Sequence, residues 1–327
     1  MPYLTDAHIS TFIQDFVNLP SDREAKYRKQ VRHLRDRFSS YAAGHPDLQV
    51  VKLLGSGSLK KRTHNAKLND IDIAAYVDCG KVSASSIAEV DGDRLLENVC
   101  ATLRQVYGKT KDPGDFEIRS TAVAIHFHGS GLDVDVVPVV IDHSSSADEG
   151  WVLRGSSTPL RTSIPRHGAF IKSVEDEHPG FRPFVRLLKW WRTTNEVGVR
   201  SFLLELLAAH LVREGEFAPN RPLDAFEGFV DWVSQTRLDV DIWFDDWHPE
   251  SKERRDRPFV MDPVNPANNA AEKLQEVWGP SQRLEELVEA ADEAAAWLSE
   301  AVAARTRTQA RDCLARVLGP SAKAVIQ

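Results

Sequence analysis

Two aspartates, one residue apart, stand inside an otherwise apolar run in the stretch NDIDIAAYV. Successive side chains of a strand point to opposite faces, so Asp70 and Asp72 would share one face while Ile71 and Ile73 share the other. Two carboxylates this close repel each other and raise one pKa, unless a cation lies between them. Mg²⁺ suits this role because it combines a few carboxylate oxygens with phosphate oxygens and water. The pair therefore indicates a divalent metal site.

A second acidic strand could supply a third carboxylate. In GLDVDVVPVV, Asp133 and Asp135 alternate with apolar residues and would again share one face. Three carboxylates are typical of two-metal sites, in which one ion activates the attacking oxygen and the other steadies the leaving phosphate. The acids together predict phosphoryl or nucleotidyl transfer.

The segment before the paired acids fits a phosphate site. It contains two Gly-Ser pairs, at 55–56 and 57–58, directly after an apolar run. A Gly-Ser turn offers backbone N–H groups and a hydroxyl in an arrangement suited to phosphate oxygens. The basic residues 60–62 either help to hold phosphate or form a solvated surface. We therefore expect phosphate and metal side by side.

The elements that must position these residues can be read from hydrophobic periodicity. Tyr27, Val31, Leu34 and Phe38 are spaced by three and four, which predicts an amphipathic helix over 22–43. We predict a strand and turn over 48–58, strands over 68–78, 116–129 and 130–142, and a helix over 85–108. The Gly-Ser-Gly between the last two strands predicts a hairpin.

Beyond about residue 165 the pattern becomes helical, with predicted helices over 181–194, 201–215 and within 283–319. The sequence therefore predicts an α/β half followed by a helical half, with the boundary near Pro159 and Pro165. A length of 327 residues allows two domains, or one large domain with an elaboration.

Bulk composition narrows the classes of partner. A formal net charge of -7 gives no reason to expect a long nucleic acid as the main partner. The N-terminal stretch lacks the pattern of a secretory signal, and no apolar run approaches the roughly 20 residues that a membrane span needs. We expect a cytoplasmic protein with no membrane contact. The three cysteines form no CxxC pair, which argues against a disulfide framework and a zinc ribbon.

The chain resembles the polymerase-β-like nucleotidyltransferase superfamily in its glycine-serine and paired-acid signature, GSLKKRT followed by NDIDI. Its VDVVP resembles the third-acid strand of the oligoadenylate synthetase and cGAS/DncV-like branch, and RLLKWWR followed by VRSFLLELL resembles a helix pair of that branch. An Asp-Pro segment of the same branch is matched by Asp262, Pro263, Pro266 and Asn269. The resemblance runs in the right order from about residue 22 to about residue 300.

This resemblance implies an α+β fold. Residues 1–165 would form a nucleotidyltransferase palm with a mixed β-sheet and an N-terminal helix, and residues 166–327 a helical C-terminal lobe. Nucleoside triphosphates would bind in the cleft between the two.

The resemblance also assigns roles to the acids and the turn. Asp70, Asp72 and Asp135 would be the catalytic acids and would bind two Mg²⁺ or Mn²⁺ ions, with Asp133 the rival for the third place. The position before Val-Val-Pro favours Asp135. The pair Gly57 and Ser58 would form the phosphate turn, because a threonine at 63 then falls where the family has one, while the pair at 55–56 remains an alternative.

The helix pair would bind the nucleotide. Lys189 and Ser201 would hold the triphosphate, and Phe202, where the family often has tyrosine, would stack on a base. Lys189 and Ser201 also have structural alternatives. Lys189 could snorkel at the edge of a helix, and Ser201 could be a helix N-cap.

Other side chains fit structural roles better. His126 and His128 flank one residue of a strand, but no third ligand stands at a suitable spacing, so we interpret both as structural. The tryptophans at 190–191 and the aromatic residues of 243–248 are interpreted as core and lid packing, with base stacking as the alternative.

The chain has no Cys/His insertion like that of the animal cGAS enzymes, and it therefore resembles a bacterial CD-NTase of CBASS anti-phage defence. Such an enzyme would make a cyclic oligonucleotide second messenger from NTPs and release pyrophosphate. An activating partner protein and a downstream effector that reads the product would go with it. Two alternatives stay open: a transferase that adds nucleotides to RNA or protein, and a catalytically silent NTP-binding module.

Overall fold

The computed structural model describes residues 2–68, 70–145, 148–154, 157–248, 257–274 and 280–326. The chain forms two compact units. The sheet unit comprises Pro20–Arg62 and Leu68–Ala169, and the helical unit comprises Met1–Leu19, Thr63–Lys67 and Phe170–Gln327. This division differs from the sequence-based limits of 1–165 and 166–327, because two short stretches from the first half of the chain belong to the helical unit.

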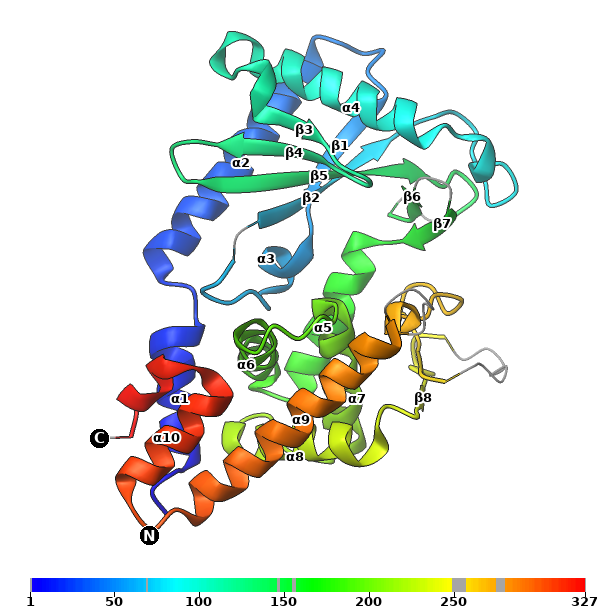
Figure 1. The fold of residues 1–327 in the computed structure, drawn as a ribbon. Coiled ribbons are helices and arrows are strands. Elements are labelled where there is room, and N and C mark those ends of the chain that lie inside the picture. Colours follow the sequence, from blue (N-terminus) through cyan, green and yellow to red (C-terminus); the bar gives the residue numbers. More distant parts are fainter. Residues whose placement is uncertain are drawn as a thin grey trace. The chain divides into compact units, whose positions relative to one another are not determined.

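A mixed sheet forms the centre of the sheet unit (Figure 1). Its strands, in the described part of the chain, follow the order β1-β2-β5-β4-β3, with β6 pairing β5 and β7. They are β1 (Val50–Gly55), β2 (Asp70–Val77), β3 (Phe116–Ile118), β4 (Val123–Phe127), β5 (Leu132–Ile141), β6 (Gly150–Arg154) and β7 (Ser157–Thr162). β2 and β5 run parallel, and the other described pairs are antiparallel. The predicted α+β fold with a mixed sheet is confirmed.

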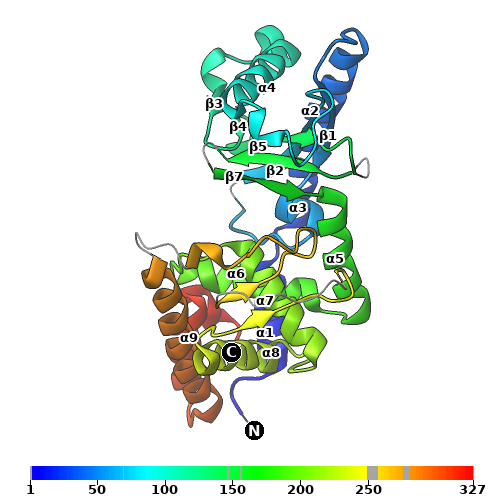
Figure 2. The ribbon, with the colours of Figure 1, turned by 90° about the vertical axis from the view of Figure 1, so that its right-hand side faces the viewer.

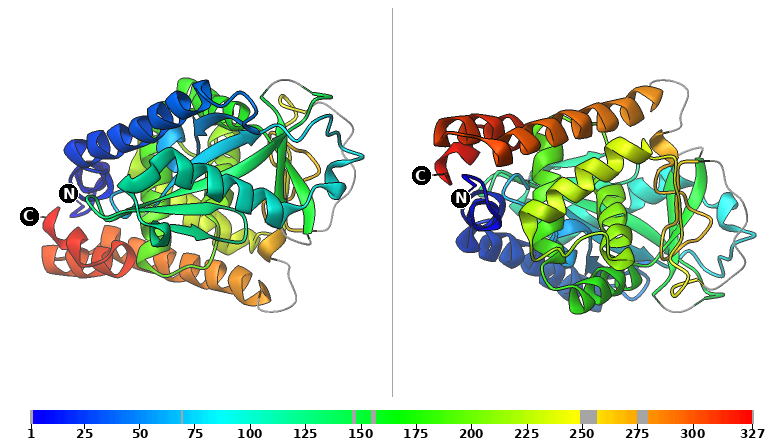
Figure 3. Two further views of the ribbon diagram at one scale, coloured as in Figure 1. Left: turned by 90° about the horizontal axis from the view of Figure 1, so that it is seen from above. Right: turned by 90° about the horizontal axis from the view of Figure 1, so that it is seen from below.

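Two long helices, α2 (Ser21–Ala43) and α4 (Gly92–Tyr107), lie across one face of this sheet (Figure 3). α2 confirms the helix predicted over 22–43. α4 begins later than the predicted residue 85, because the Asp91 carboxylate caps it by accepting the N–H groups of Asp93 and Arg94. Shorter helices are α3 (Gly57–Lys61) and the 3₁₀ turns Ile87–Glu89, Gly108–Thr110 and Pro113–Asp115.

The single strand predicted over 116–129 is wrong. The chain turns back after β3, where the N–H of Arg119 donates to the carbonyl oxygen of Ala122 at 2.8 Å, and returns as β4. The residues at the turn are serine and threonine rather than glycine or proline, so alternation alone did not reveal the break. The hairpin predicted between β4 and β5 is confirmed.

The helical unit is built on packed helices (Figure 2), and the chain enters it within α5 (Ile164–Glu177). Its described helices include α1 (Asp6–Phe12), α6 (Phe181–Thr194), α7 (Ser201–Glu214), α8 (Pro222–Thr236), α9 (Pro280–Ala303) and α10 (Arg307–Leu318). A π-helical turn, Ile13–Val17, and 3₁₀ turns at Glu272–Leu274 and Pro320–Ala324 complete the helices, and β8 (Asp241–Ile242) pairs with β9 (Phe259–Val260).

One apolar core joins these helices. Ile9 and Phe12 of α1 are fully buried in it with Trp191 of α6 and Phe229 of α8. The neighbouring Trp190 packs edge-on against Phe12, so the two tryptophans have the packing role predicted for them. No helix in the described ranges has both the length and the apolar character needed to cross a membrane.

The Asp-Pro segment forms a hydrogen-bonded turn in this unit. Asp262 is 2% exposed and accepts the N–H of Val264 at 2.8 Å and the side-chain amide of Asn268 at 2.9 Å. Asn269 accepts the N–H groups of Val260 and Ala271. These polar side chains satisfy buried backbone groups where the chain leaves β9, which gives them a structural role.

Candidate active site

The four strand aspartates lie next to each other in the sheet. β2 and β5 pair in parallel with Asp70 opposite Asp133 and Asp72 opposite Asp135. Register partners in a parallel pair point to the same side, so the four carboxylates share one face of the sheet. Their apolar neighbours Ile71 and Val134, each at most 2% exposed, lie on the other face. The structure therefore brings together acids that are more than sixty residues apart in the chain.

Gly57 lies directly against the Asp72 carboxylate. Its backbone φ is +61°, and a β-carbon at this position would come within 1.8 Å of Asp72 Oδ2. At Gly55, by contrast, a β-carbon would meet nothing within 4 Å. The Ser56 N–H also donates to the Asp72 carbonyl oxygen at 2.9 Å. Of the two Gly-Ser pairs, the first meets Asp72 through its backbone, whereas Gly57 of the second lies against the Asp72 carboxylate and opens the five-residue helix α3.

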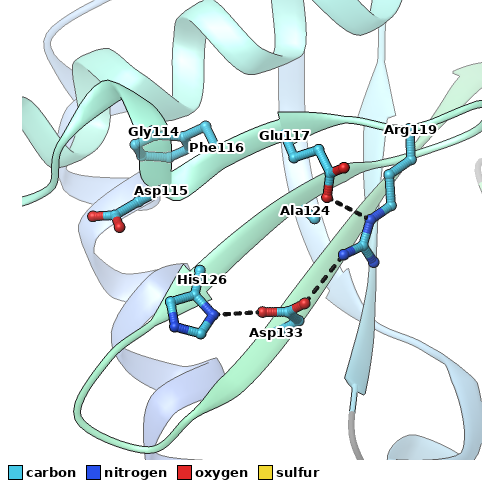
Figure 4. A pocket seen from close by; sticks show the side chains of 8 residues that line it. All are labelled: Gly114, Asp115, Phe116, Glu117, Arg119, Ala124, His126 and Asp133. Atoms are coloured by element: carbon cyan, nitrogen blue, oxygen red, sulfur yellow. Dashed lines mark hydrogen bonds and ion pairs between the residues drawn. The ribbon is translucent and has the colours of Figure 1, made fainter.

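Arg119, which the sequence analysis did not single out, bridges three carboxylates, two of which, Glu117 and Asp133, are drawn in Figure 4. Its guanidinium donates to Asp135 Oδ1 at 2.7 Å, to Asp133 Oδ2 at 3.1 Å and to Glu117 Oε2 at 3.1 Å. Asp133 also bonds His126 Nδ1 at 2.8 Å. The feature of the sequence that could have drawn attention to Arg119 is its positive charge within the largely apolar strand pattern of 116–127.

The surroundings of the two acids of β5 shift their pKa values in opposite directions. The hydrogen bond with His126, together with Arg119, holds the pKa of Asp133 below its usual range. Burial raises the pKa of Asp135, and the charge of Asp70 adds to this, although Arg119 partly offsets it. The two acids thus differ in their surroundings: Asp133 bonds both Arg119 and His126, whereas Asp135 bonds Arg119 and is the more buried of the two.

A cavity of about 450 Å³ opens beside these residues and is lined by Arg119, His126 and Asp133 among others (Figure 4). Its volume is within the range of small-molecule sites. His128, the other histidine of this region, bonds Asp115 Oδ1 at 2.6 Å. Both histidines are thus paired with carboxylates, consistent with the structural role predicted for them.

Lys189 lies in a buried ion pair of the helical unit. Its ammonium is 2.5 Å from Glu205 Oε1 of α7 and 3.0 Å from the Thr63 hydroxyl, and Thr63 donates to the same Glu205 oxygen at 2.6 Å. The side chains of Lys189 and Glu205 are 7% and 1% exposed. The snorkelling alternative is therefore wrong, because the ammonium is buried rather than held in water.

Ser201 is the first residue of α7, which begins after Arg200, so the proposed N-cap role is also wrong. Its hydroxyl accepts a hydrogen bond from Arg192 Nη1 at 2.7 Å. Phe202 is half-buried against the helical core. Arg192 itself was not foreseen; its Nε is buried and finds no acceptor among the described residues.

The acids suit a divalent cation in donor type, because carboxylate oxygens are the ligands that Mg²⁺ and Mn²⁺ prefer, and in their shared face of the sheet. As they stand, no three histidine, cysteine, aspartate or glutamate side chains in the described ranges form a group that could hold an ion. Asp135 is bonded to Arg119 instead. Metal binding here therefore stays a prediction.

Comparisons with known proteins find relatives that match most of the chain. No protein-family model matches it. A cyclic AMP-AMP-AMP synthase of Escherichia coli strain MS 115-1 is 34% identical over 271 residues, which cover 80% of this chain and 82% of the relative. The CBASS oligonucleotide cyclase CdnC of Escherichia coli strain KTE188 is 30% identical over 285 residues, covering 84% of this chain and 86% of the relative.

Solved structures of oligonucleotide cyclases also resemble this chain. A chain in the Escherichia coli MS115-1 CdnC:HORMA-deltaN complex has a TM-score of 0.84 at 29% identity, covering 98% of each chain. A Vibrio cholerae DncV structure with bound GTP has a TM-score of 0.70 at 12% identity over 98% of this chain and 97% of the other, and shows the fold alone.

The protein is thus a nucleotidyltransferase with the fold of the cGAS/DncV-like enzymes. More specifically, the chain belongs to the CBASS oligonucleotide cyclases, the CD-NTases that make cyclic oligonucleotides from NTPs. The resemblance noted in the sequence is confirmed.

Proposed function

We propose that this cyclase uses ATP to make a cyclic oligoadenylate and that Asp70, Asp72 and Asp135 bind two Mg²⁺ or Mn²⁺ ions for the reaction. Two observations on relatives support the choice of nucleotide. One relative is named for a cyclic AMP-AMP-AMP product, and an Escherichia coli MS115-1 CdnC structure, with a TM-score of 0.84 to this chain, was solved with ATP.

The observation that carries the proposal is the parallel register of β2 and β5. It sets Asp72 beside Asp135 and Asp70 beside Asp133 on one face. Four carboxylates on one face repel each other, and cations close by would stabilise their charged forms. Because Asp133 already bonds both His126 and Arg119, and because Asp135 lies opposite Asp72 in the register, we assign the third ligand to Asp135.

In the proposed reaction a ribose hydroxyl of one nucleotide attacks the α-phosphorus of a second. The new P–O bond replaces the bond to the β-phosphate oxygen, and pyrophosphate leaves. Asp135 would accept the hydroxyl proton, a role supported by its place beside Asp72 on the acidic face of the sheet. Bound divalent cations would neutralise the charge that develops on the phosphates. Repetition and ring closure give the cyclic product.

The turn at Gly57 and Ser58 is proposed to donate to the phosphates, because its backbone lies against Asp72. On the basis of the family resemblance, Ser201 and Lys189 would contact the triphosphate, and Phe202 would stack on a base. For Lys189 this contact requires the ammonium to leave its buried carboxylate partner, which is costly in a low-dielectric site.

A partner protein is part of the proposal. A CdnC chain that resembles this one was solved in a complex with HORMA-deltaN. We therefore propose that a HORMA-type protein binds this cyclase and controls its activity, and that an effector reads the product. The proposed location is the cytoplasm, where NTPs are available.

Incubation of the purified protein with α-labelled NTPs and Mg²⁺ or Mn²⁺, with and without the partner, tests the proposal. We expect a phosphatase-resistant product that requires ATP alone. Asp72→Asn and Asp135→Asn should lower its formation by at least about a thousandfold, because each removes a carboxylate that would hold the cations neutralising the phosphate charge. Asp133→Asn is the matched control and should retain most of the activity.

Other outcomes would contradict specific parts. A product that needs another NTP would rule out the oligoadenylate. Label that appears on RNA or protein would favour the acceptor-modifying transferase. Loss of activity in Asp133→Asn with retention in Asp135→Asn would reverse the assignment of the third acid.

A further inference from the structure

Arg119 contacts the site from a fixed position. It directly follows β3, and its N–H donates to the Ala122 carbonyl oxygen across the turn to β4. From there its guanidinium reaches Glu117, Asp133 and Asp135 with three separate donor nitrogens. The side chain is 36% exposed and borders the 450 Å³ cavity.

Arg119 bonds Asp135, which the proposed function assigns as a metal ligand. A guanidinium and a divalent cation are both positive, and both use carboxylate oxygens. Asp135 Oδ1 is bonded to Arg119 at 2.7 Å, and the Asp135 side chain is 17% exposed. While this bond exists, that oxygen has a cationic partner already.

The other two contacts of Arg119 do not involve a proposed metal ligand. If the bond to Asp135 were broken, the guanidinium would still be bonded to Glu117 and Asp133. The adjoining cavity leaves room for it to shift.

We propose that Arg119 is a positioning residue that serves as the counter-ion of Asp135 before a divalent cation binds, and that the cation and the guanidinium compete for this carboxylate. The inference rests on the metal site proposed above. Arg119 offsets the repulsion among Asp70, Asp72 and Asp135, and it makes metal binding weaker than the acids alone would allow.

Mn²⁺ binding without nucleotide, followed by electron paramagnetic resonance of the free ion, tests this competition. Arg119→Gln removes the cation but keeps a polar side chain. We expect it to bind Mn²⁺ about two- to fivefold more tightly than the wild-type chain, because a partly exposed ion pair contributes only modestly. Arg104→Gln is the matched control, because Arg104 is an exposed arginine of the same unit whose guanidinium bonds the Pro113 carbonyl oxygen. It should bind Mn²⁺ as the wild type does.

Thermal unfolding provides a second readout. In EDTA, Arg119→Gln should melt at a lower temperature than the wild type, because the acids lose their counter-ion, and saturating Mn²⁺ should restore more of the melting temperature than in the wild type. A purely structural arginine would lower both melting temperatures equally.

The outcomes separate the two proposals. If the wild type and Asp135→Asn bind Mn²⁺ equally, or neither binds it, the proposed metal site is wrong, and the competition with it. If the wild type binds Mn²⁺ through Asp135 but Arg119→Gln shows equal or weaker affinity, only the competition is overturned.

Discussion

At the scale of single residues, the contact between Gly57 and Asp72 is the tightest constraint on the site. A β-carbon at Gly57 would overlap the Asp72 carboxylate, and the φ of +61° is one that other residues rarely adopt. We predict that Gly57→Ala displaces Asp72 and lowers product formation about a hundredfold or more, since a shift of about 1 Å can cost this much. Initial rates with labelled NTPs measure the effect.

Gly55→Ala is the control for this prediction. A β-carbon at position 55 would meet nothing within 4 Å, and the residue ends β1 two positions before Gly57, so its alanine variant should keep nearly full activity. Thermal melting of both variants separates a local displacement from unfolding. Equal activity of the two alanine variants would contradict the role given to Gly57.

At the scale of elements, α6 and α7 are joined by the buried pair of Lys189 and Glu205, to which Thr63 adds a hydrogen bond. We predict that Lys189→Met lowers the free energy of unfolding by about 3–5 kcal/mol, because it leaves the Glu205 carboxylate buried without its cation. The double variant Lys189→Met, Glu205→Leu should recover most of this loss. Urea unfolding followed by circular dichroism measures both.

A stable Lys189→Met variant would mean that the pair contributes little to the packing of α6 on α7. In that case the same variant becomes a test of the nucleotide role, and its ATP affinity should fall. A destabilised single variant with a stable double variant would instead assign Lys189 to the structure of the helical unit.

At the scale of the whole molecule, the helical unit is assembled from three separate stretches of chain. Ile9 and Phe12 of the first stretch are fully buried in its core. We predict that a fragment of residues 166–327 does not fold by itself, because it would expose the apolar surface that α1 covers. A fragment that joins residues 1–19 to 166–327 by a flexible linker should show cooperative thermal unfolding. A cooperative transition in the shorter fragment would contradict this prediction.

The strand pattern of this site was predictable because alternation is local. A period of two places Asp70 with Asp72 and Asp133 with Asp135 on single faces whatever else the chain does, and the strands β2 and β5 were found where expected. The 3.6-residue period of 22–43 likewise predicted α2. The family resemblance rested on these same short motifs.

Partners distant in the sequence were not predictable in this way. The single strand expected over 116–129 is two strands, and the turn between them is what aims Arg119 at Asp133 and Asp135. Nothing near Lys189 in the sequence shows that Glu205 and Thr63 surround its ammonium. Such pairings depend on which elements pack together, and propensity within a window carries little information about that.

The sequence by itself thus determined the acid pairs, the glycine-serine motif, several of the long helices, among them α2, α6 and α7, and, through the order of the motifs, the family. Only the tertiary structure decided that β2 and β5 are parallel neighbours in this register, that Gly57 rather than Gly55 meets Asp72, and that Arg119 holds Asp135. The physical reason is the distance along the chain over which each feature is determined. Side-chain direction along a strand or helix follows from backbone geometry over a few residues, whereas a carboxylate acquires its neighbours and its counter-ion from strands that meet only when the chain has folded.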